Sequence, residues 1–222
     1  HKYSQIIGSL LYISNRTRPD ISYAVGRLSR YTSNPSQEHW TALERVLKYL
    51  KGTIDYSLIY SGHPDLLEGY SDANWVTDSR QVKSTSGFIF LFGGGAISWG
   101  SVKQTIIARS TSDAELIALD TTCLEAEWLR NLLLDLSFLF KIVPPVHVHC
   151  DSTAVLDLLA QETVNAKLNR HLQIRYKSIK RLMRDYVTLD FVRSEENLSD
   201  PLTKGLSRKK ILDSSRGMGL SP

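Results

Sequence analysis

Three apolar, strand-like runs in succession are the feature that most limits what this sequence can fold into. They cover residues 66–76, 85–92 and 96–108, and the glycine triplet Gly93-Gly94-Gly95 joins the last two. Glycines between two apolar strands are typical of a hairpin turn, and the triplet lacks the Gly-Lys-Ser/Thr ending of a phosphate-binding loop. The three runs therefore predict antiparallel hairpins.

After residue 110 the pattern changes to alternating helices and strands. We expect a long helix over 112–136, capped by Ser110 or Thr111, and a last helix from about Asn197. Between them the sequence predicts a strand at 146–151, helices at 153–160 and 169–185, and a strand at 186–192. Together with the hairpins, this order predicts an α/β fold in which helices cover the faces of a mixed sheet.

The two ends of the chain have a different character. Residues 3–51 are predicted to be helical, with a break at Pro19 and a helix that Asn34 caps. A strand-like run follows at 56–60, and Gly, Ser, Lys and Arg are frequent in 207–222, which predicts a partly ordered tail. Since the chain begins at His1 rather than at a methionine, we expect it to belong to a longer protein.

Composition narrows the class of protein. The net charge is +4 and the pI about 9.0, which favours an anionic partner. No apolar run approaches the roughly 18 residues that cross a bilayer, so no membrane partner is expected. Cys123 and Cys150 have no Cys-x-x-Cys partner and lie in apolar surroundings, which predicts buried thiols in a reducing, intracellular compartment.

Four acidic residues recur where a strand ends or a helix begins: Asp72, Glu115, Asp151 and Asp200. Taken singly, each has an ordinary explanation as an edge, capping or helix-dipole residue. Taken together, they predict a magnesium site, because magnesium prefers oxygen ligands. Two such ions about 4 Å apart can activate water and stabilise the leaving oxygen of a phosphodiester. Asp113 lies on a different face of its helix from Glu115, so Glu115 is the acid expected to face the sheet.

Longer motifs follow one another along nearly the whole chain. In order they are Gly8-Ser9-Leu10-Leu11-Tyr12, Thr17-Arg18-Pro19-Asp20-Ile21-Ser22-Tyr23-Ala24-Val25, Val46-Leu47-Lys48-Tyr49-Leu50-Lys51-Gly52-Thr53, Gly69-Tyr70-Ser71-Asp72-Ala73-Asn74-Trp75, Lys83-Ser84-Thr85-Ser86-Gly87, Ile97-Ser98-Trp99, Ser110-Thr111-Ser112-Asp113-Ala114-Glu115, Cys150-Asp151-Ser152 and Leu198-Ser199-Asp200-Pro201-Leu202-Thr203-Lys204. With these motifs the sequence resembles the C-terminal part of a copia-type LTR-retrotransposon polyprotein, in which the end of the reverse transcriptase precedes a ribonuclease H domain.

The resemblance implies a ribonuclease H-like mixed sheet behind a small helical segment. Its domains would be a helical reverse-transcriptase remnant at 1–60, the ribonuclease H domain at 61–206 and a tail at 207–222. The four acids would bind two Mg²⁺ ions, for which Mn²⁺ can substitute, and cut the RNA strand of an RNA–DNA hybrid. The implied partners are the hybrid and the polymerase part of the same polyprotein, with a cytoplasmic particle and the nucleus both open as locations.

The sequence departs from the family pattern in three places. It contains no Tyr-x-Asp-Asp polymerase motif, so no DNA synthesis is expected. The loop before Asp200 lacks the histidine that many ribonucleases H carry there. His171 is a candidate auxiliary residue, with a surface or capping role as the alternative. Asp113 and Leu116 replace the usual Glu and Tyr but leave Glu115 in place.

A run of positive charge offers a nucleic-acid surface. Seven Lys or Arg and no Asp or Glu lie between Lys167 and Arg184. Four of them share one helical face, and two residues near the long helix add to the charge; the proposed contacts are Arg170, Lys177, Arg181, Arg184, Lys103 and Arg109. An ordinary solvated face is the alternative to phosphate contact. Hybrid selectivity would come from 2′-hydroxyl contacts and duplex shape.

Three other functions stay open. His147, His149 and Asp151 alternate along one strand and resemble a His-x-His-x-Asp zinc site, although no further histidine follows soon after. The chain could also be a nucleic-acid-binding remnant that is weak or inactive as a nuclease. An integrase- or resolvase-like nuclease of similar fold would cut duplex DNA as well.

Overall fold

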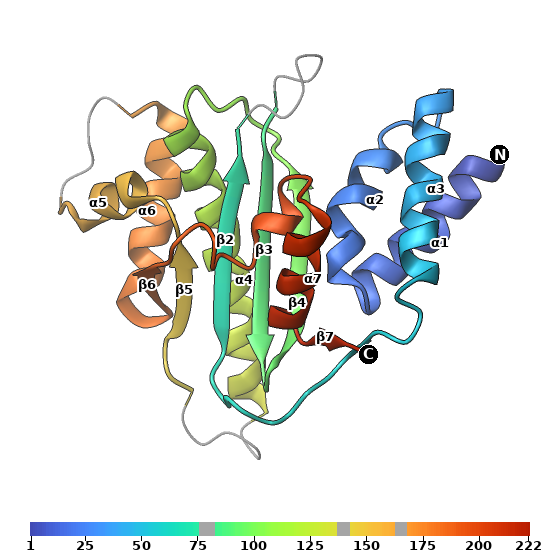
Figure 1. Cartoon of the computed structure of the whole chain (residues 1–222). Coiled ribbons are helices and arrows are strands. Elements are labelled where there is room, and N and C mark those ends of the chain that lie inside the picture. Colours follow the sequence, from blue (N-terminus) through green and yellow to red (C-terminus); the bar gives the residue numbers. More distant parts are fainter. Residues whose placement is uncertain (76–82, 137–142, 163–167) are drawn as a thin grey trace.

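A five-stranded mixed sheet forms the centre of the molecule, with the strand order β4-β3-β2-β5-β6 (Figure 1). The computed structural model describes residues 1–75, 83–136, 143–162 and 168–222. The strands are β2 (Glu68–Asn74), β3 (Thr85–Phe92), β4 (Gly95–Lys103), β5 (Val146–Cys150) and β6 (Val187–Phe191). β2, β3 and β4 are antiparallel, whereas β5 is parallel to β2 and β6 is parallel to β5. The prediction of a ribonuclease H-like mixed α/β sheet is confirmed.

The glycine triplet makes the predicted hairpin between β3 and β4. Gly93 and Gly94 have φ of 61° and 86°, a conformation that residues with a Cβ rarely adopt. β4 ends at Lys103 rather than at Ala108, because the next residue turns inward. The buried amide of Gln104 donates to Ser86 Oγ and to the carbonyl of Ala114, both at 2.9 Å. Val76, expected as the end of the first strand, lies outside the described residues.

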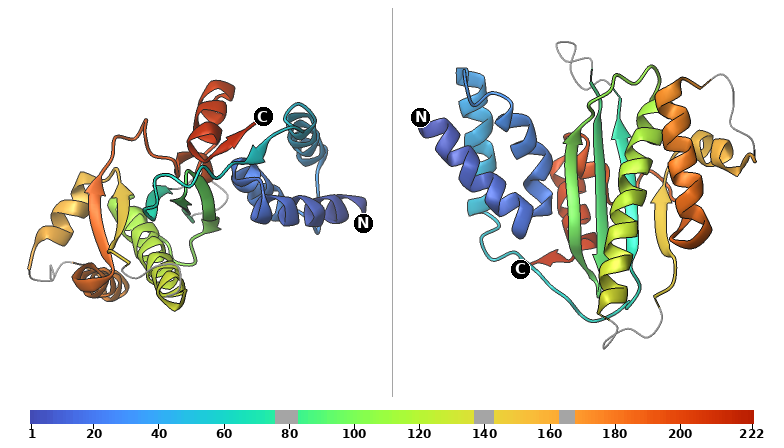
Figure 2. Two further views of the ribbon diagram at one scale, coloured as in Figure 1. Left: turned by 90° about the horizontal axis from the view of Figure 1, so that it is seen from below. Right: turned by 180° about the vertical axis from the view of Figure 1, so that it is seen from behind.

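Helices cover one face of the sheet, as the view from behind shows (Figure 2). They are α4 (Thr111–Asp135), α5 (Thr153–Ala160) and α6 (Arg170–Asp185). Phe90, Leu119, Val148 and Ile179 are fully buried in the core between these helices and the sheet. Ser110 is the cap of α4, since its hydroxyl accepts from the backbone N–H of Asp113. None of the helices in the described ranges has the length and apolar character that crossing a bilayer requires.

The C-terminal residues cover the other face over β3 and β4 (Figure 1). The predicted helix at Asn197 is instead the short 3-10 helix η2 (Asp200–Leu202), followed by α7 (Arg208–Gly217). The tail prediction for 207–222 differs from the structure, in which these residues form α7 and β7 (Leu220–Ser221). Met218 and Leu220 are fully buried and anchor them, although the surrounding sequence is mostly polar.

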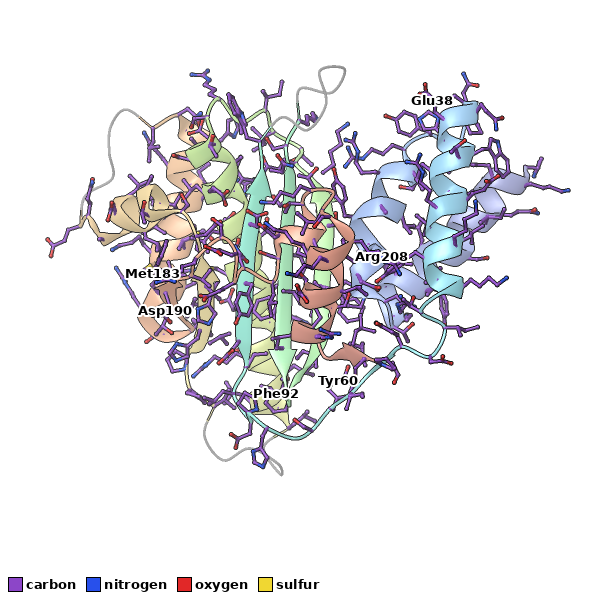
Figure 3. The ribbon with its side chains drawn as sticks, viewed as in Figure 1. Glu38, Tyr60, Phe92, Met183, Asp190 and Arg208 are labelled. Carbon is purple, nitrogen blue, oxygen red and sulfur yellow. The ribbon has the colours of Figure 1, made fainter. Side chains whose placement is uncertain are left out.

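The strand predicted at 56–60 is reduced to β1 (Ser57–Leu58), which pairs with β7 outside the main sheet. The rest of this run crosses the lower end of the sheet, where Figure 3 labels Tyr60 and Phe92. The Tyr60 hydroxyl donates to the carbonyl of Ala96 at 2.8 Å. Because the partner of β1 comes from the far end of the chain, local pattern alone overestimates this strand.

The N-terminal helices pack into a small core of their own, which includes Ile7, Leu10, Val25 and Leu43. They are α1 (Lys2–Arg16), the 3-10 helix η1 (Pro19–Ile21), α2 (Ser22–Ser29) and α3 (Gln37–Lys51). The break at Pro19 is confirmed. Asn34 is not the cap of α3; Ser36 is, in a capping box with His39. Trp99 on β4 donates its indole N–H to the carbonyl of Ser14 at 2.7 Å and so joins this segment to the sheet.

A buried ion pair closes the helical segment. The Arg18 guanidinium binds Asp20 through two nitrogens, at 3.0 and 2.7 Å, and donates to the carbonyl and hydroxyl of Thr53. The hydroxyl of Tyr49 donates to the same carboxylate at 2.7 Å. This network ties the start of η1 to the end of α3.

We predict that Arg18→Met lowers the free energy of unfolding by about 3–5 kcal/mol, because it leaves the Asp20 carboxylate buried without its cation. Urea unfolding followed by circular dichroism measures the change. Arg45→Met is the matched control, since Arg45 is exposed on α3, and it should stay within about 0.5 kcal/mol of the parent. Equal loss in both variants would contradict a specific role for the buried pair.

Candidate metal centre

Four different elements supply the four acidic residues. Asp72 lies on β2, Asp151 follows β5 directly, Glu115 lies in the second turn of α4, and Asp200 opens η2. β2 and β5 are parallel neighbours in which Ser71 is paired with Cys150. The next residues along the two strands are Asp72 and Asp151, so the parallel register brings these two acids side by side.

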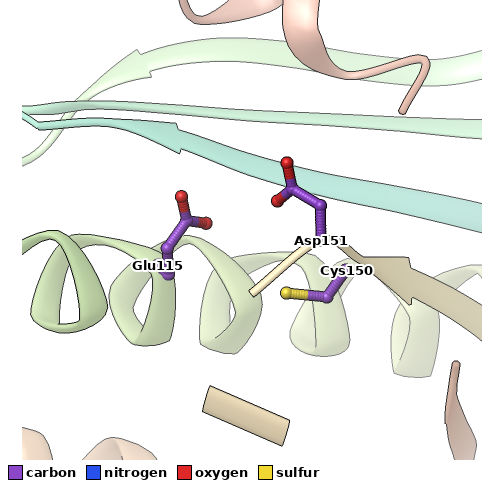
Figure 4. A group of neighbouring side chains, drawn as sticks. All are labelled: Glu115, Cys150 and Asp151. Carbon is purple, nitrogen blue, oxygen red and sulfur yellow. The ribbon is translucent and has the colours of Figure 1, made fainter. Parts of the chain in front are cut away.

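The carboxylates gather into one cluster. Ligand atoms of Asp72, Asp151 and Asp200 all lie within 4.8 Å of one another. Ligand atoms of Glu115, Cys150 and Asp151 also lie within 4.8 Å of one another. Asp151 belongs to both groups, and Figure 4 shows its carboxyl group turned to the same side as that of Glu115. The structure therefore brings together all four acids that the sequence predicts.

Burial gives this cluster unusual electrostatics. Burial, with the charges of Asp72 and Asp151, raises the pKa of Glu115 to about 9. Burial also raises the pKa of Asp72 to about 6, although Lys204 and the Thr203 hydroxyl oppose that shift. Among the described residues, Glu115 Oε2 has no hydrogen-bond partner. Buried carboxylates with an orphaned oxygen fit a hard divalent cation such as magnesium.

Cys150 lies next to the carboxylates, but its thiol is a poor ligand for magnesium. Its side chain is 1% exposed and packs in the core under the sheet. Burial raises its pKa to about 12, which keeps it a thiol. Magnesium prefers oxygen to sulfur, so the candidate metal ligands are the carboxylates of Asp72, Asp151 and Asp200, with Glu115 beside Asp151.

Known proteins similar to this chain place it in a family. No protein-family model matches it. The retrovirus-related Pol polyprotein from transposon TNT 1-94 of Nicotiana tabacum is 39% identical over 210 residues, which is 94% of this chain. The chain belongs to the copia-type retrotransposon Pol polyproteins. It spans 16% of the length of that relative.

Two further similarities concern part of the sequence and the fold. Secreted RxLR effector protein 161 of Plasmopara viticola is 43% identical over 128 residues, which is 57% of this chain and 90% of that protein. The structure of the foamy viral protease-reverse transcriptase in complex with dsDNA covers 87% of this Pol segment with a TM-score of 0.55, and this segment covers 38% of that chain. At 16% identity, this similarity shows the fold alone.

Two neighbours of Asp200 in sequence complete the centre of this Pol segment. The Thr203 hydroxyl donates to Asp72 Oδ2. Lys204 Nζ lies 2.7 Å from Asp200 Oδ1 and 3.9 Å from Asp72 Oδ2. Both residues belong to the motif at 198–204, in which the sequence predicts a role for Asp200 alone. The spacing of four residues between Asp200 and Lys204 is the sequence signal for this ion pair.

Asn197 fixes the segment that carries Asp200. Its side-chain amide donates to the carbonyl of Ser71 at 2.9 Å, and its oxygen accepts from the N–H and the hydroxyl of Ser199. Asn197 is only 3% exposed. It therefore links the loop directly to the residue that precedes Asp72, a contact that sequence reasoning missed.

Gly87 makes room for the same segment. It is paired with Asp72 across β2 and β3. A Cβ at this position would lie 2.6 Å from Thr203 Cγ2, 3.0 Å from Leu202 Cβ and 3.1 Å from the carbonyl oxygen of Ser199. The last residue of the motif at 83–87 is therefore glycine because η2 packs directly against the strand.

The histidines lie apart from the acids. His171 is exposed in the first turn of α6, and neither group of candidate ligands found among the described residues includes it. In the loop that lacks a histidine, the Ser194 hydroxyl donates to Asp151 Oδ2 at 2.6 Å. His147 contacts Asp190 at 2.9 Å, and the ring of His149 packs on Tyr70. The structure therefore does not assemble the alternative zinc site from His147, His149 and Asp151.

The basic helix is partly engaged within the protein. Arg181 pairs with Glu127 of α4 at 2.9 Å. Arg170, Lys177 and Arg184 are exposed on α6, whereas Lys167 lies outside the described residues. Lys103 ends β4, the edge strand at the opposite end of the strand order from β6, and Arg109 is exposed in the loop that leads to α4.

We predict that Gly87→Ala displaces η2 and lowers the free energy of unfolding by about 1–3 kcal/mol, as overpacking of a full site does. Thermal or urea unfolding measures the loss. Gly205→Ala is the matched control, because a Cβ there has no atom within 4 Å. If Gly87→Ala is as stable as Gly205→Ala, η2 does not pack tightly on β3.

The raised pKa values predict how pH affects the metal-free protein. Folded Glu115 and Asp72 keep their protons up to about pH 9 and 6, whereas the unfolded chain releases them near pH 4. The stability that these groups contribute is therefore complete at low pH and is lost as pH rises through their folded pKa values.

In EDTA at pH 8, we expect Glu115→Gln to be more stable than the parent by about 1–3 kcal/mol, with the difference vanishing near pH 4. Urea unfolding at both pH values measures it. Glu44→Gln is the control, since Glu44 is exposed on α3, and it should leave the pH profile unchanged. If the free energy of unfolding of Glu115→Gln changed with pH in the same way as that of the parent, the Glu115 carboxyl group would be ionised in the folded chain.

Proposed function

We propose that this Pol segment is a magnesium-dependent ribonuclease H that cuts the RNA strand of RNA–DNA hybrids. The observation that carries the proposal is the convergence of Asp72, Glu115, Asp151 and Asp200 at the ends of two parallel strands. The chemistry needs several carboxylates at one point and no nucleophilic side chain. The copia-type relationship supports the same activity.

The proposed roles of the residues follow from their contacts. Asp72, Asp151, Asp200 and Glu115 hold two Mg²⁺ ions, or Mn²⁺ in their place. When bound, the ions supply an activated water and charge stabilisation for the leaving oxygen. Thr203 orients the Asp72 carboxyl group, and Asn197 keeps Asp200 beside β2. Ser194 orients Asp151 from the loop in which many ribonucleases H carry a histidine. An auxiliary role of His171 has less support, because neither group of candidate ligands among the described residues includes it.

The hybrid is proposed to bind across the edge of the sheet where β2 and β5 end. Arg170, at the start of α6, lies at the end of the sheet where the acids are, and Lys177 and Arg184 lie progressively farther along the helix. These three residues are proposed to contact phosphates along the hybrid, and Lys103 and Arg109 to contact it near the start of α4. Arg181 contributes less, because its guanidinium already binds Glu127 through two nitrogens.

We also propose that residues 1–60 end the reverse transcriptase, that the ribonuclease H domain occupies 61–206, and that the polymerase part of the polyprotein helps hold the hybrid.

Asp72→Asn should reduce cleavage of a labelled RNA–DNA hybrid by at least about 1,000-fold, because the four acids act as one unit. Hybrid affinity, measured by fluorescence anisotropy, should stay within about threefold, because phosphate contacts dominate binding. Asp190→Asn is the matched control on the open part of the sheet, where Figure 3 labels Asp190. Cleavage by Asp72→Asn at the parental rate would refute the site.

The same assay separates the other functions. Binding of the hybrid without cleavage by the parent would favour a nucleic-acid-binding remnant, for which the similarity to a protein named as a secreted effector is the specific support. Equal cleavage of a DNA duplex would favour an integrase- or resolvase-like nuclease. We expect the parent protein to release labelled RNA fragments from the hybrid and to leave the DNA duplex uncut.

Replacing both Lys177 and Arg184 with Ala should weaken hybrid binding, and the slope of log affinity against log salt should fall by about 1–2. Binding titrations at several salt concentrations measure the slope. Replacing Arg45 and Lys51 on α3 is the matched control, with an unchanged slope expected. An unchanged slope in the α6 variant would exclude these two residues from phosphate contact.

A further inference from the structure

A lysine side chain lies within the acid cluster itself. Lys204 Nζ is 2.7 Å from Asp200 Oδ1 and 3.9 Å from Asp72 Oδ2, so its ammonium group bridges two of the proposed metal ligands. The Asp72 and Asp200 side chains are 4% and 11% exposed, whereas Lys204 is 38% exposed. The acids are thus fixed in the interior, and the lysine reaches them from the surface.

The Lys204 ammonium group lies between carboxylates that could also bind a metal cation. Ligand atoms of Asp72, Asp151 and Asp200 lie within 4.8 Å of one another, and like charges at that spacing repel strongly in a buried site. Lys204 is the basic residue that the ion pairs of the described residues place against these acids. Its positive charge therefore offsets the repulsion that would otherwise open the cluster.

The Lys204 side chain can move out of the acid cluster, because the contacts that hold the cluster are made by other residues. Asp200 is held from three sides, since Asn197 binds Ser71, η2 packs on Gly87, and Thr203 binds Asp72. Lys204 lies beyond these contacts, with exposed Gly205 next to it. Its flexible four-carbon stem can move the ammonium group into solvent without disturbing the acids.

We propose that Lys204 is a built-in counter-cation, which holds the acid cluster closed and leaves when a divalent ion binds between Asp72 and Asp200. The inference rests on the proposed metal centre and concerns how this chain controls access to it. An ammonium group and a divalent ion cannot share the space between the same two carboxylates, because their charges repel. Lys204 therefore weakens metal binding while it stabilises the metal-free fold.

A structural tether makes the opposite prediction. If Lys204 only positioned Asp200, its loss would loosen a ligand and weaken metal binding. If Lys204 competes with the ion, its loss strengthens metal binding. The sign of the change in affinity therefore separates the two roles.

Isothermal titration of the EDTA-treated full chain with Mg²⁺ tests the proposal. We expect Lys204→Met, which keeps the length of the side chain without its charge, to bind Mg²⁺ at least about 10-fold more tightly than the parent. Lys204→Arg, which keeps the charge, should bind no more tightly than the parent. Lys209→Met removes an exposed charge from the first turn of α7 and is the matched control, with less than about a twofold change expected.

Thermal unfolding supplies a second readout that does not depend on cleavage. Lys204→Met should melt below the parent in EDTA and gain more than the parent on addition of Mg²⁺. Unchanged or weaker Mg²⁺ binding by a folded Lys204→Met would overturn the counter-cation role and leave the metal centre intact. If neither the parent nor Lys204→Met bound Mg²⁺, the metal centre would fail and the inference with it.

Discussion

The parallel pairing of β2 with β5 is the constraint on which the rest of the structure depends. It places Asp72 of β2 beside Asp151, the residue that directly follows β5, near the C-terminal ends of both strands. The antiparallel strands β3 and β4 extend the sheet on one side of this strand pair, and β6 extends it on the other. Parallel neighbours require a crossover connection, and here α4 provides it and brings Glu115 to the same place.

Holding four acids together is costly, and the chain offsets that cost with its own groups. Burial favours the protonated forms of Glu115 and Asp72, Thr203 donates to Asp72, and Lys204 supplies a positive charge. Asn197 and the absence of a side chain at Gly87 hold the fourth acid against β2. Repulsion among these acids lowers the stability of the metal-free fold, and a bound cation would remove that repulsion. Such a loss of stability in favour of binding is expected of a metal site.

Much of the fold could be predicted because the decisive signals were local. The glycine triplet and the apolar runs identified the hairpins, Ser110 identified the start of α4, and Pro19 ended α1. Errors arose where a partner distant in sequence decides the outcome. β1 is short because its partner is β7, and the polar residues 207–222 are ordered by the burial of Met218 and Leu220. Four acids could be selected from their positions at strand and helix ends, and the spacing of Lys204 from Asp200 signals their ion pair, but the contacts of Asn197 with Ser71 and of Lys204 with Asp72 needed the folded chain.

The most direct test of the metal centre is a crystal structure of the full chain grown with Mn²⁺, examined by anomalous scattering at the manganese absorption edge. The structure and chemistry described above predict anomalous peaks within bonding distance of Asp72, Asp151 and Asp200, with Glu115 beside them and the Lys204 ammonium group displaced. An ordered acid cluster without manganese, at a Mn²⁺ concentration that supports cleavage, would contradict the account.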